Sequence, residues 1–252
     1  MPDTEPVLRV EGVQKAFGGV RAVDGVSFVL PRGEIRALIG PNGAGKSTFF
    51  NILTGQLRAD AGRVYYRGAD ISGLPPYAIA RRGVSRTFQI TATFATLSAL
   101  ENVQVAWLAH AGQSRVLRTP AARLDAEPAR ALLRHVGLAE EASRPAATLA
   151  YGDLKKLELA IALANDPALL LLDEPTAGMA PAERGALMTL TAGIARARGL
   201  TVLFTEHDMD VVFAIAQRIM VLHQGRVIAD GTPAAVRANP EVQAVYLGDE
   251  VG

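Results

Sequence analysis

The sequence predicts an α/β protein with a mainly parallel sheet, an N-terminal antiparallel β subdomain and an inserted helical subdomain. Residues 33–40 read as an apolar strand, and unbroken apolar runs, typical of strands buried on both faces of a parallel sheet, occur at 169–172 and 201–205. A helical pattern at 182–198 lies between the last two runs. From about residue 91 to 156 the β signal fades and helical periodicity replaces it. These observations indicate a parallel core interrupted by helices.

The other elements complete this outline. Residues 7–10 and 20–30 are β-rich and are joined through a pair of glycines, which predicts an antiparallel edge. Shorter β-like stretches occur at 63–67 and 83–88. The helical segments of the insertion are expected at 98–110, 125–136 and 151–164.

One domain accounts for the whole chain. Its 252 residues can bury a substantial core, and an apolar share of 49% with 20% charged residues is the balance of a globular protein. We expect residues 1–90 and 165–252 to form the core of this domain and 91–164 to form the helical subdomain.

The charge balance argues against a nucleic-acid partner. Lys and Arg number 26 against 25 Asp and Glu, so the net charge of +1 creates no global field for polyanions. Residues 81–135 nevertheless carry a local excess of positive charge, with only three acidic residues. Either a solvated helical surface or a surface near membrane headgroups explains it. The arginines are Arg81, Arg82, Arg86, Arg115, Arg118, Arg123, Arg130 and Arg134.

The sequence also indicates a compartment. The chain has no cysteine, which agrees with a reducing environment and excludes thiolate chemistry. Its N-terminus, MPDTEPVLRV, has acids and prolines where a signal peptide needs basic and apolar residues. No apolar run approaches the 18 residues or so of a spanning helix. We expect the chain in the cytosol.

A glycine-rich loop is the strongest chemical signal. Residues 40–48, GPNGAGKST, match GxxxxGKS and lie between a predicted strand and a helix beginning near Lys46. Backbone N–H groups and the helix dipole suit an anion, Lys46 adds charge, and the Ser47 hydroxyl can bind Mg²⁺. A chance glycine-rich turn is disfavoured by these flanks. The predicted phosphate-binding residues are Gly40, Pro41, Asn42, Gly43, Ala44, Gly45, Lys46, Ser47 and Thr48.

Two carboxylates end a later strand. The apolar run at 169–172 is followed by Asp173 and Glu174. In a P-loop protein the first carboxylate holds the Mg²⁺ water shell, and the second orients or deprotonates the attacking water. A strand-terminal Asp-Glu pair is common, so this interpretation depends on the glycine-rich loop.

Further landmarks in fixed order carry a family resemblance. Gln89 ends the stretch RTFQ, LAYGD at 149–153 stands where LSGGQ is usual, and His207 follows the strand at 201–205. Alone, such a glutamine is usually a surface amide and such a histidine usually structural. In this order, the chain resembles the ABC ATPases from about Val7 to Gly248, which implies a P-loop NTPase core, ATP and Mg²⁺.

The resemblance implies roles for individual residues. Phe17 would stack on adenine. Ser47 and Gln89 would bind Mg²⁺, and Asp173 would hold its water shell. The catalytic set would be Lys46, the carboxylate Glu174, and His207 in contact with the γ-phosphate. The signature turn, which comprises Ala150, Tyr151 and Gly152, would cap the γ-phosphate bound to the other protomer.

Three positions depart from the family pattern. Ala150 replaces the signature serine, so backbone N–H groups and the helix dipole must contact the partner's phosphate. Ala180 stands where aspartate is frequent and Ile161 where arginine is common. Their effect on communication between the two ATP sites of a dimer stays open. The sequence keeps Lys46 and Glu174, which the resemblance assigns to catalysis, so we expect hydrolysis of ATP.

A narrower resemblance concerns the transported substrate. LAYGD, EHDMD at 206–210 and the terminal AVYLG resemble the ATP-binding subunits of branched-chain amino acid importers, and urea or amide importers are similar. This implies a homodimer or heterodimer on the cytoplasmic face of the inner membrane. It also implies permease subunits and, indirectly, a solute-binding protein. The alternative is the ATPase of a lipid or lipopolysaccharide exporter. A DNA-maintenance ATPase is disfavoured, because such proteins carry long coiled coils and this sequence shows no sustained heptads.

The resemblance also implies a docking surface at the uncharged segment 90–100. In the resembled family this region belongs to a groove that receives a short permease helix. Phe94 and Leu97 would supply apolar contact, and Arg81 and Arg82 could pair with acids or headgroups. Packing within the helical subdomain is the alternative for either apolar side chain, and it is the expected role of Trp107.

Overall fold

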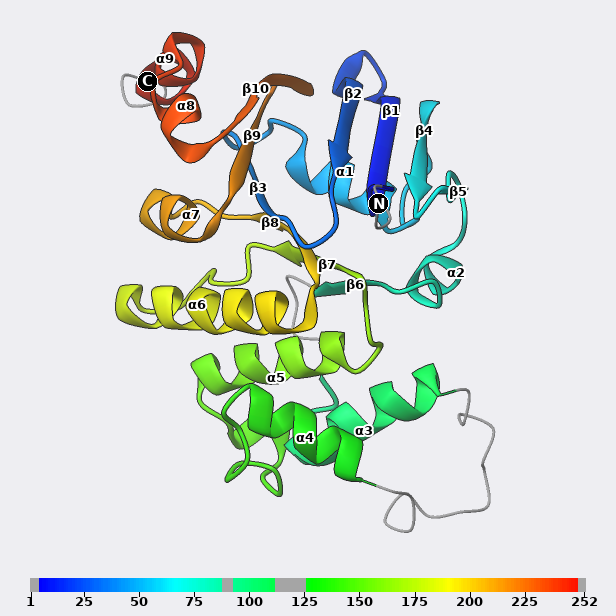
Figure 1. Cartoon of the computed structure of the whole chain (residues 1–252), viewed down its shortest axis with the longest axis vertical. Helices are drawn as coiled ribbons and strands as arrows, with labels where there is room; N and C mark the ends of the chain where they lie inside the picture. The colour runs from blue at the N-terminus through cyan, green and yellow to red at the C-terminus, as the bar shows by residue number, and fades with distance from the viewer. Residues whose placement is uncertain (1–4, 88–92, 112–125, 249–252) are drawn as a thin grey trace.

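Two sheets and a helical layer build the molecule (Figure 1). This computed structural model describes residues 5–87, 93–111 and 126–248. The first sheet is antiparallel, as predicted, and its strands are ordered β2-β1-β4-β5. They span Val20–Leu30, Leu8–Phe17, Ala61–Tyr66 and Ala69–Asp70.

The second sheet is the mainly parallel core. Its order is β10-β9-β3-β8-β7-β6, and only β10 runs antiparallel to its neighbour. Strands β3, β7 and β8 are buried along their whole length, which explains the apolar runs of β7 and β8 and the mainly apolar sequence of β3. From β10 to β6 the strands span Arg226–Gly231, Arg218–His223, Ile35–Ile39, Thr201–Thr205, Leu169–Asp173 and Val84–Thr87.

Alternate residues of β7 face different hydrophobic cores. Leu169 and Leu171 pack in one cluster with Phe49 and Phe50 of helix α1 (Lys46–Leu53), on the side of the antiparallel sheet. Leu170 and Leu172 pack on the opposite face in a second cluster with helices α5 (Tyr151–Leu163) and α6 (Pro181–Arg198). Helices α1 and α5 therefore belong to different layers, with the sheet between them (Figure 1).

The helical layer follows the predicted segments. Helices α3 (Ala99–His110) and α4 (Glu127–His135) pack together and against α5, which in turn packs against α6. Trp107 packs on this core, as expected. No helix within the described ranges is both long and apolar enough to cross a membrane.

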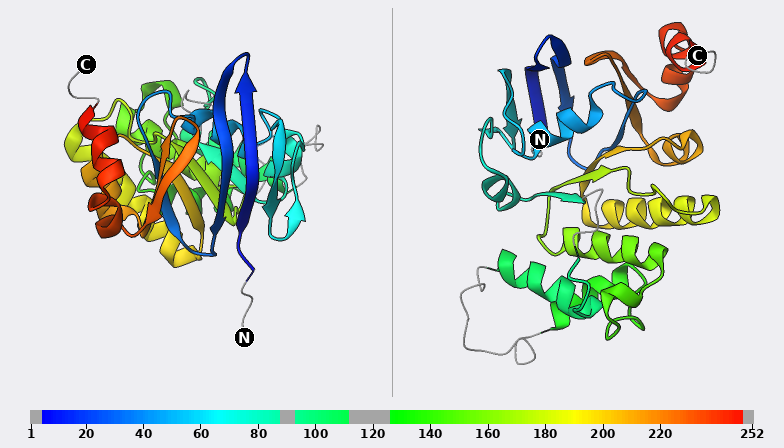
Figure 2. Two further views of the ribbon diagram at one scale, coloured as in Figure 1. Left: turned by 90° about the horizontal axis from the view of Figure 1, so that it is seen from above. Right: turned by 180° about the vertical axis from the view of Figure 1, so that it is seen from behind.

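Several elements were not predicted. The first strand continues beyond residue 10 to Phe17, because irregular register after Val10 breaks the alternation that the sequence pattern relies on. Strands β9 and β10 and the helices α2 (Pro76–Ala80), α7 (Met209–Ile215), α8 (Pro233–Arg237) and α9 (Pro240–Gly248) were also missed. Helices α8 and α9 lie across β9 and β10 from the antiparallel sheet (Figure 2).

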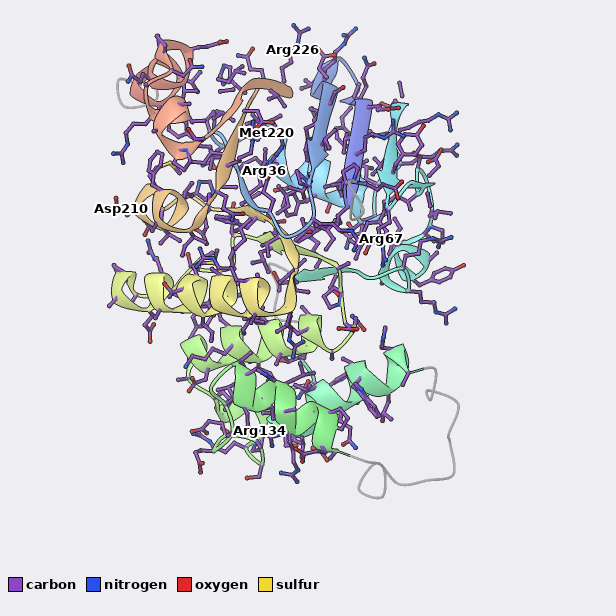
Figure 3. All side chains as sticks on the ribbon, viewed as in Figure 1. Arg36, Arg67, Arg134, Asp210, Met220 and Arg226 are labelled. Carbon is purple, nitrogen blue, oxygen red and sulfur yellow. The ribbon has the colours of Figure 1, made fainter. Side chains whose placement is uncertain are left out.

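One arginine of the predicted basic surface turns inward. The side chain of Arg86 is only 9% exposed and pairs with Asp173. From β6 its side chain reaches Asp173 and Asn51 inside the protein, so it is no part of a solvated or membrane-facing surface. Arg81 and Arg82 are exposed, and Arg134 lies on the outer part of the helical layer (Figure 3).

Candidate active site

The glycine-rich loop connects β3 to α1 and leaves no room for side chains at two positions. A Cβ atom on Gly40 would lie 2.1 Å from the carbonyl oxygen of Leu222, and one on Gly45 would lie 2.0 Å from that of Ala22. Gly45 also adopts a φ of 104° directly before the helix. These glycines let the backbone fold tightly enough to turn its N–H groups toward an anion.

Lys46 is the buried cation of this loop. Its Nζ donates to the carbonyl oxygens of Gly40 and Pro41, at 2.5 and 3.0 Å. Burial lowers the pKa of its ammonium, and the nearby charges of Glu174 and Asp173 act in the opposite direction. A depression of about 190 Å³ beside it is lined by Ala22 and by residues 42–48. Its size and loop backbone suit phosphate groups.

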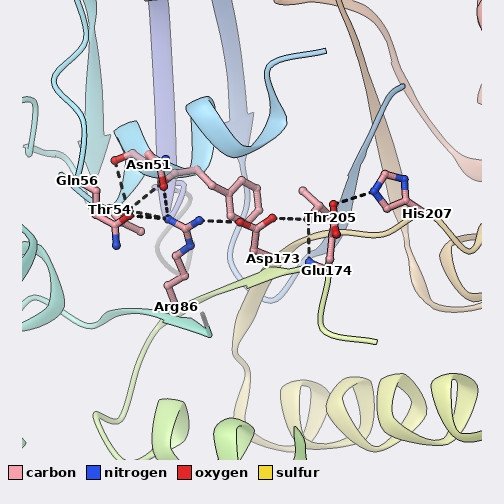
Figure 4. Close-up of polar contacts among 9 residues, drawn as sticks. Asn51, Thr54, Gln56, Arg86, Asp173, Glu174, Thr205 and His207 are labelled. Atoms are coloured by element: carbon pink, nitrogen blue, oxygen red, sulfur yellow. Dashed lines mark hydrogen bonds and ion pairs between the residues drawn. The ribbon is translucent and has the colours of Figure 1, made fainter. Parts of the chain in front are cut away.

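Asp173 is fixed at the end of β7. Its Oδ1 accepts a hydrogen bond from Thr205 Oγ1 at 2.9 Å, and its Oδ2 accepts one from Arg86 at 2.6 Å (Figure 4). Only 3% of its side chain is exposed. The same Thr205 hydroxyl accepts from the backbone N–H of Glu174 at 3.0 Å, so a single side chain positions both carboxylate residues.

Glu174 and His207 meet at this edge. His207 Nε2 lies 2.8 Å from Glu174 Oε1 (Figure 4). Glu174 has a φ of 48°, which a side chain other than glycine adopts only at a cost. Its backbone N–H also donates to the carbonyl oxygen of Thr205 at 3.2 Å, which helps to hold this conformation. The structure thus brings together two residues that are 33 positions apart in the sequence.

Glu206 ties the two loops of the site and was missed by sequence reasoning. It is buried, and its Oε1 accepts from the backbone N–H and the hydroxyl of Thr176, at 2.9 and 2.7 Å. Its Oε2 accepts from the backbone N–H of His207 at 3.2 Å. The sequence signal that could have indicated this role is the position of Glu206, an acidic residue directly before His207.

The signature turn begins helix α5 in the other layer. Ala150 is the N-cap residue, and Tyr151 and Gly152 are the first two residues of the helix. The Tyr151 hydroxyl donates to the carbonyl oxygen of Ala177 at 2.8 Å, so this turn contacts the loop after the carboxylates. The structure does not place the turn around the depression beside Lys46.

Two of the three residues that depart from the family pattern stand at the N-cap of a helix. Ala150 caps α5 and Ala180 caps α6, and neither helix has a side-chain hydrogen bond at its N-cap. Serine and aspartate, the residues usual at these positions, are good N-cap residues. Ile161, the third departure, packs partly buried against the core.

The last three predicted residues are Phe17, Ser47 and Gln89. Phe17 ends β1 with 52% of its surface exposed, and Lys15 Nζ lies 5.6 Å from its ring centroid. Ser47 is exposed in the first turn of α1. Gln89 lies outside the described residues.

Among the described residues, acidic and histidine side chains alone do not form a metal-binding site. Within residues 5–87, 93–111 and 126–248, no three of them gather closely enough to hold a metal ion. Mg²⁺ is usually bound by one or two protein groups together with substrate phosphates and waters. A hydroxyl on α1 and a fixed carboxylate at the end of β7 fit that donor set.

Comparison with known families identifies the class of protein. Residues 23–177 match the ABC transporter family, and residues 226–252 match the family described as branched-chain amino acid ATP-binding cassette transporter. The chain therefore belongs to the ABC transporter family, as an ATP-hydrolysing subunit of a transporter.

Individual relatives and solved structures are similar to this chain over nearly its whole length. The high-affinity branched-chain amino acid transport ATP-binding protein BraF of Pseudomonas aeruginosa is 42% identical over 253 residues, covering 98% of this chain and 99% of BraF. The ADP conformation of MJ1267, an ATP-binding cassette of an ABC transporter, matches with a TM-score of 0.87 and 32% identity. That match covers 97% of this chain and 100% of MJ1267.

A third similar structure is a dimer. The post-hydrolysis state of the ATP-binding cassette MJ0796, bound to ADP and Pi, matches with a TM-score of 0.75 and 26% identity. It covers 90% of this chain and 98% of that cassette. These matches confirm the predicted P-loop NTPase fold and favour amino-acid transport over the exporter alternative.

Proposed function

We propose that this chain binds ATP with Mg²⁺ at the loop of residues 40–48 and uses its hydrolysis to drive import of branched-chain amino acids or related small amino acids or amides. The observation that carries the catalytic part is the Glu174–His207 contact of 2.8 Å beside the fixed carboxylate of Asp173. Phe17 would stack on the adenine, because its ring is exposed at the end of a strand.

Each group at the edge of the sheet has a role in this proposal. Lys46 exchanges its two carbonyl contacts for phosphate oxygens, so its charge is already in place before ATP arrives. Glu174 orients the attacking water and accepts its proton, while His207 holds Glu174 and contacts the γ-phosphate. Mg²⁺, held through Ser47, Gln89 and a water on Asp173, would neutralise charge on the phosphate oxygens.

Two protomers are needed because the signature turn and the phosphate loop lie in different layers of one chain. A second copy, or a related subunit, would bring its own Ala150, Tyr151 and Gly152 over the γ-phosphate. The dimeric MJ0796 cassette supports this arrangement. In this proposal residues 1–90 and 165–252 form the nucleotide-binding core, and 91–164 the helical subdomain that carries the signature turn.

Membrane partners complete the proposal. Permease subunits would bind the chain at the cytoplasmic face of the inner membrane, and a solute-binding protein would deliver the substrate on the other side. Phe94 is 58% exposed, as a docking residue should be. The transport name of BraF and the C-terminal family match support the choice of substrate.

Uptake by a reconstituted complex tests the function. The chain and the permease genes of its source would be expressed together, placed in liposomes, and given ATP, the binding protein and labelled leucine or urea. We expect ATP-dependent leucine uptake, with Glu174→Gln as the inactive control. ATP-dependent movement of a glycolipid without leucine uptake would contradict the import proposal.

A further inference from the structure

Arg86 joins three elements around the site. Its Nη2 donates to Asp173 Oδ2 at 2.6 Å, and its Nη1 donates to Asn51 Oδ1 at 2.7 Å (Figure 4). Nη1 also lies 3.3 Å from Thr54 Oγ1 and from Gln56 Oε1. The guanidinium on β6 thus connects the carboxylate at the end of β7 to α1 and the turn that follows it.

The register of the sheet explains how the arginine reaches this place. Arg86 pairs with Leu171 in the parallel ladder between β6 and β7. Leu171 and Asp173 are two residues apart, so they share a face of the strand with each other and with Arg86. That face packs against α1, because Leu171 and Phe50 belong to the same hydrophobic cluster. The Arg86 guanidinium carbon lies 5.7 Å from the Phe50 ring centroid.

Stability alone is a poor explanation for this arginine. The side chains of Arg86 and Asp173 are only 9% and 3% exposed, and a buried ion pair loses much of its Coulomb energy to desolvation. Arg86 Nε is buried and has no hydrogen-bond partner within the described ranges, which adds a further cost. Apolar side chains in place of both partners would fill this space with less penalty, whereas replacing only one of them leaves a buried charge without its partner.

We infer that Arg86 is a positioning residue for the hydrolytic site: its planar fork fixes the Asp173 carboxylate against α1. This inference rests on the magnesium role proposed for Asp173. Thr205 holds Oδ1 and Arg86 holds Oδ2, so the carboxylate cannot rotate without breaking one of two hydrogen bonds. Because Ser47 lies on the same α1 helix, the fork sets the spacing between two groups proposed to bind Mg²⁺ or its water.

A buried arginine elsewhere in the chain gives a matched control. Arg36 on β3 is 3% exposed and pairs with Glu34 and Asp230, which have no role in the proposed chemistry (Figure 3). Replacing either arginine should lower the melting temperature. Only replacement of Arg86 should change the dependence on magnesium.

The test compares Arg86→Gln, Arg86→Lys, Asn51→Ala, Asp173→Asn and Arg36→Lys with the wild type. For each we would measure ATPase activity against Mg²⁺ concentration, affinity for a fluorescent ATP analogue in EDTA, and the melting temperature. Arg86→Gln should raise the Mg²⁺ concentration for half-maximal activity about 10-fold or more, as outer-shell changes at metal sites do. Affinity in EDTA should stay within about 2-fold, because Arg86 is not proposed to contact phosphate. Arg86→Lys should be intermediate, since it keeps the charge but loses the fork.

The outcomes separate this inference from the function on which it rests. If Asp173→Asn leaves the magnesium requirement unchanged, the proposed role of Asp173 is wrong. If Asp173→Asn shifts it but Arg86→Gln only lowers the melting temperature, as Arg36→Lys does, the positioning inference alone is overturned. Should Arg86→Gln fail to fold, Asn51→Ala decides, because it removes one anchor of the fork and should raise the requirement roughly 2-fold to 3-fold.

Discussion

The carboxylate edge of the parallel sheet and the signature turn of α5 are both proposed parts of an ATP-hydrolysing site, yet the chain fixes them very differently. At the edge, Asp173 has a hydrogen bond on each oxygen and Glu174 is held through its backbone and by His207. At the turn, Ala150 has no side-chain cap, and Tyr151 is 47% exposed. The edge is organised within one chain, whereas the turn presents a surface that a second chain can complete.

Glu174→Gln tests the edge with the largest expected effect. The amide keeps the shape of the side chain but cannot accept a proton, so steady-state ATPase should fall by about 100-fold or more. ATP binding should persist, and size-exclusion chromatography with ATP should show an accumulated dimer. Glu140→Gln, which changes an exposed acid of the helical layer, is the matched control. Turnover at the wild-type rate would remove Glu174 from its role.

Lys46→Ala tests the same edge through binding. The lost ammonium contacts phosphate in the ground state, so affinity for an ATP analogue should fall roughly 10-fold to 100-fold, together with turnover. Equilibrium titration measures this, with Arg196→Ala on the exposed end of α6 as a charge-matched control. Unchanged affinity and unchanged rate would contradict the phosphate-loop assignment.

The two regions also differ in how far sequence alone could predict them. The loop 40–48 and the pair Asp173 and Glu174 are local patterns whose flanking strands and helix are strongly apolar, so their placement followed from neighbouring residues. The contact of Glu174 with His207 depends on the order of the parallel strands, which was not predicted; the family resemblance only assigned both residues to the site.

What the sequence could not predict depends on register and on single side-chain directions. Arg86 is one of eight arginines in a basic stretch. The β-like pattern at 83–88 separates it from the exposed Arg81 and Arg82, but it does not predict which face of the sheet the side chain occupies. Its inward direction follows from pairing with Leu171, a contact between distant segments. Glu206 likewise gains its role from Thr176 on another loop.

Phe94→Asp tests whether surfaces outside the edge need other chains. The backbone around Phe94 is held by the buried Asn102, whose amide bonds both its N–H and its carbonyl oxygen, so the exposed ring is not needed for the local fold. Co-purification with the permease should drop roughly 10-fold, while basal ATPase and the melting profile stay unchanged. Val29→Asp, at an exposed position of the antiparallel sheet, should leave assembly intact.

Either of two results would reject the docking role of Phe94. Normal assembly and transport by Phe94→Asp would show that the ring does not contact the permease. An unfolded variant would instead support the alternative that this side chain packs the helical subdomain.

Ala150→Ser tests the signature turn and has the smallest expected effect. Ala150 has φ and ψ of −62° and 153°, close to the −64° and 163° of Ser98, which caps α3. Ser98 Oγ accepts from the backbone N–H of Glu101, so a serine at position 150 should accept from Asp153 in the same way. The free energy of unfolding should rise by about 1 kcal/mol. The melting temperature should rise by roughly 2–4 °C.

Stability and activity of this variant answer different questions about the turn. Ala147→Ser, an exposed position that caps no α-helix, should leave both unchanged. If Ala150→Ser raises stability but leaves ATPase within about 2-fold, the backbone N–H groups of α5 already suffice for the partner's phosphate. If ATPase rises further, the missing hydroxyl limits the reaction. No gain in melting temperature would show that the turn is already satisfied by other contacts, and the comparison with Ser98 would fail.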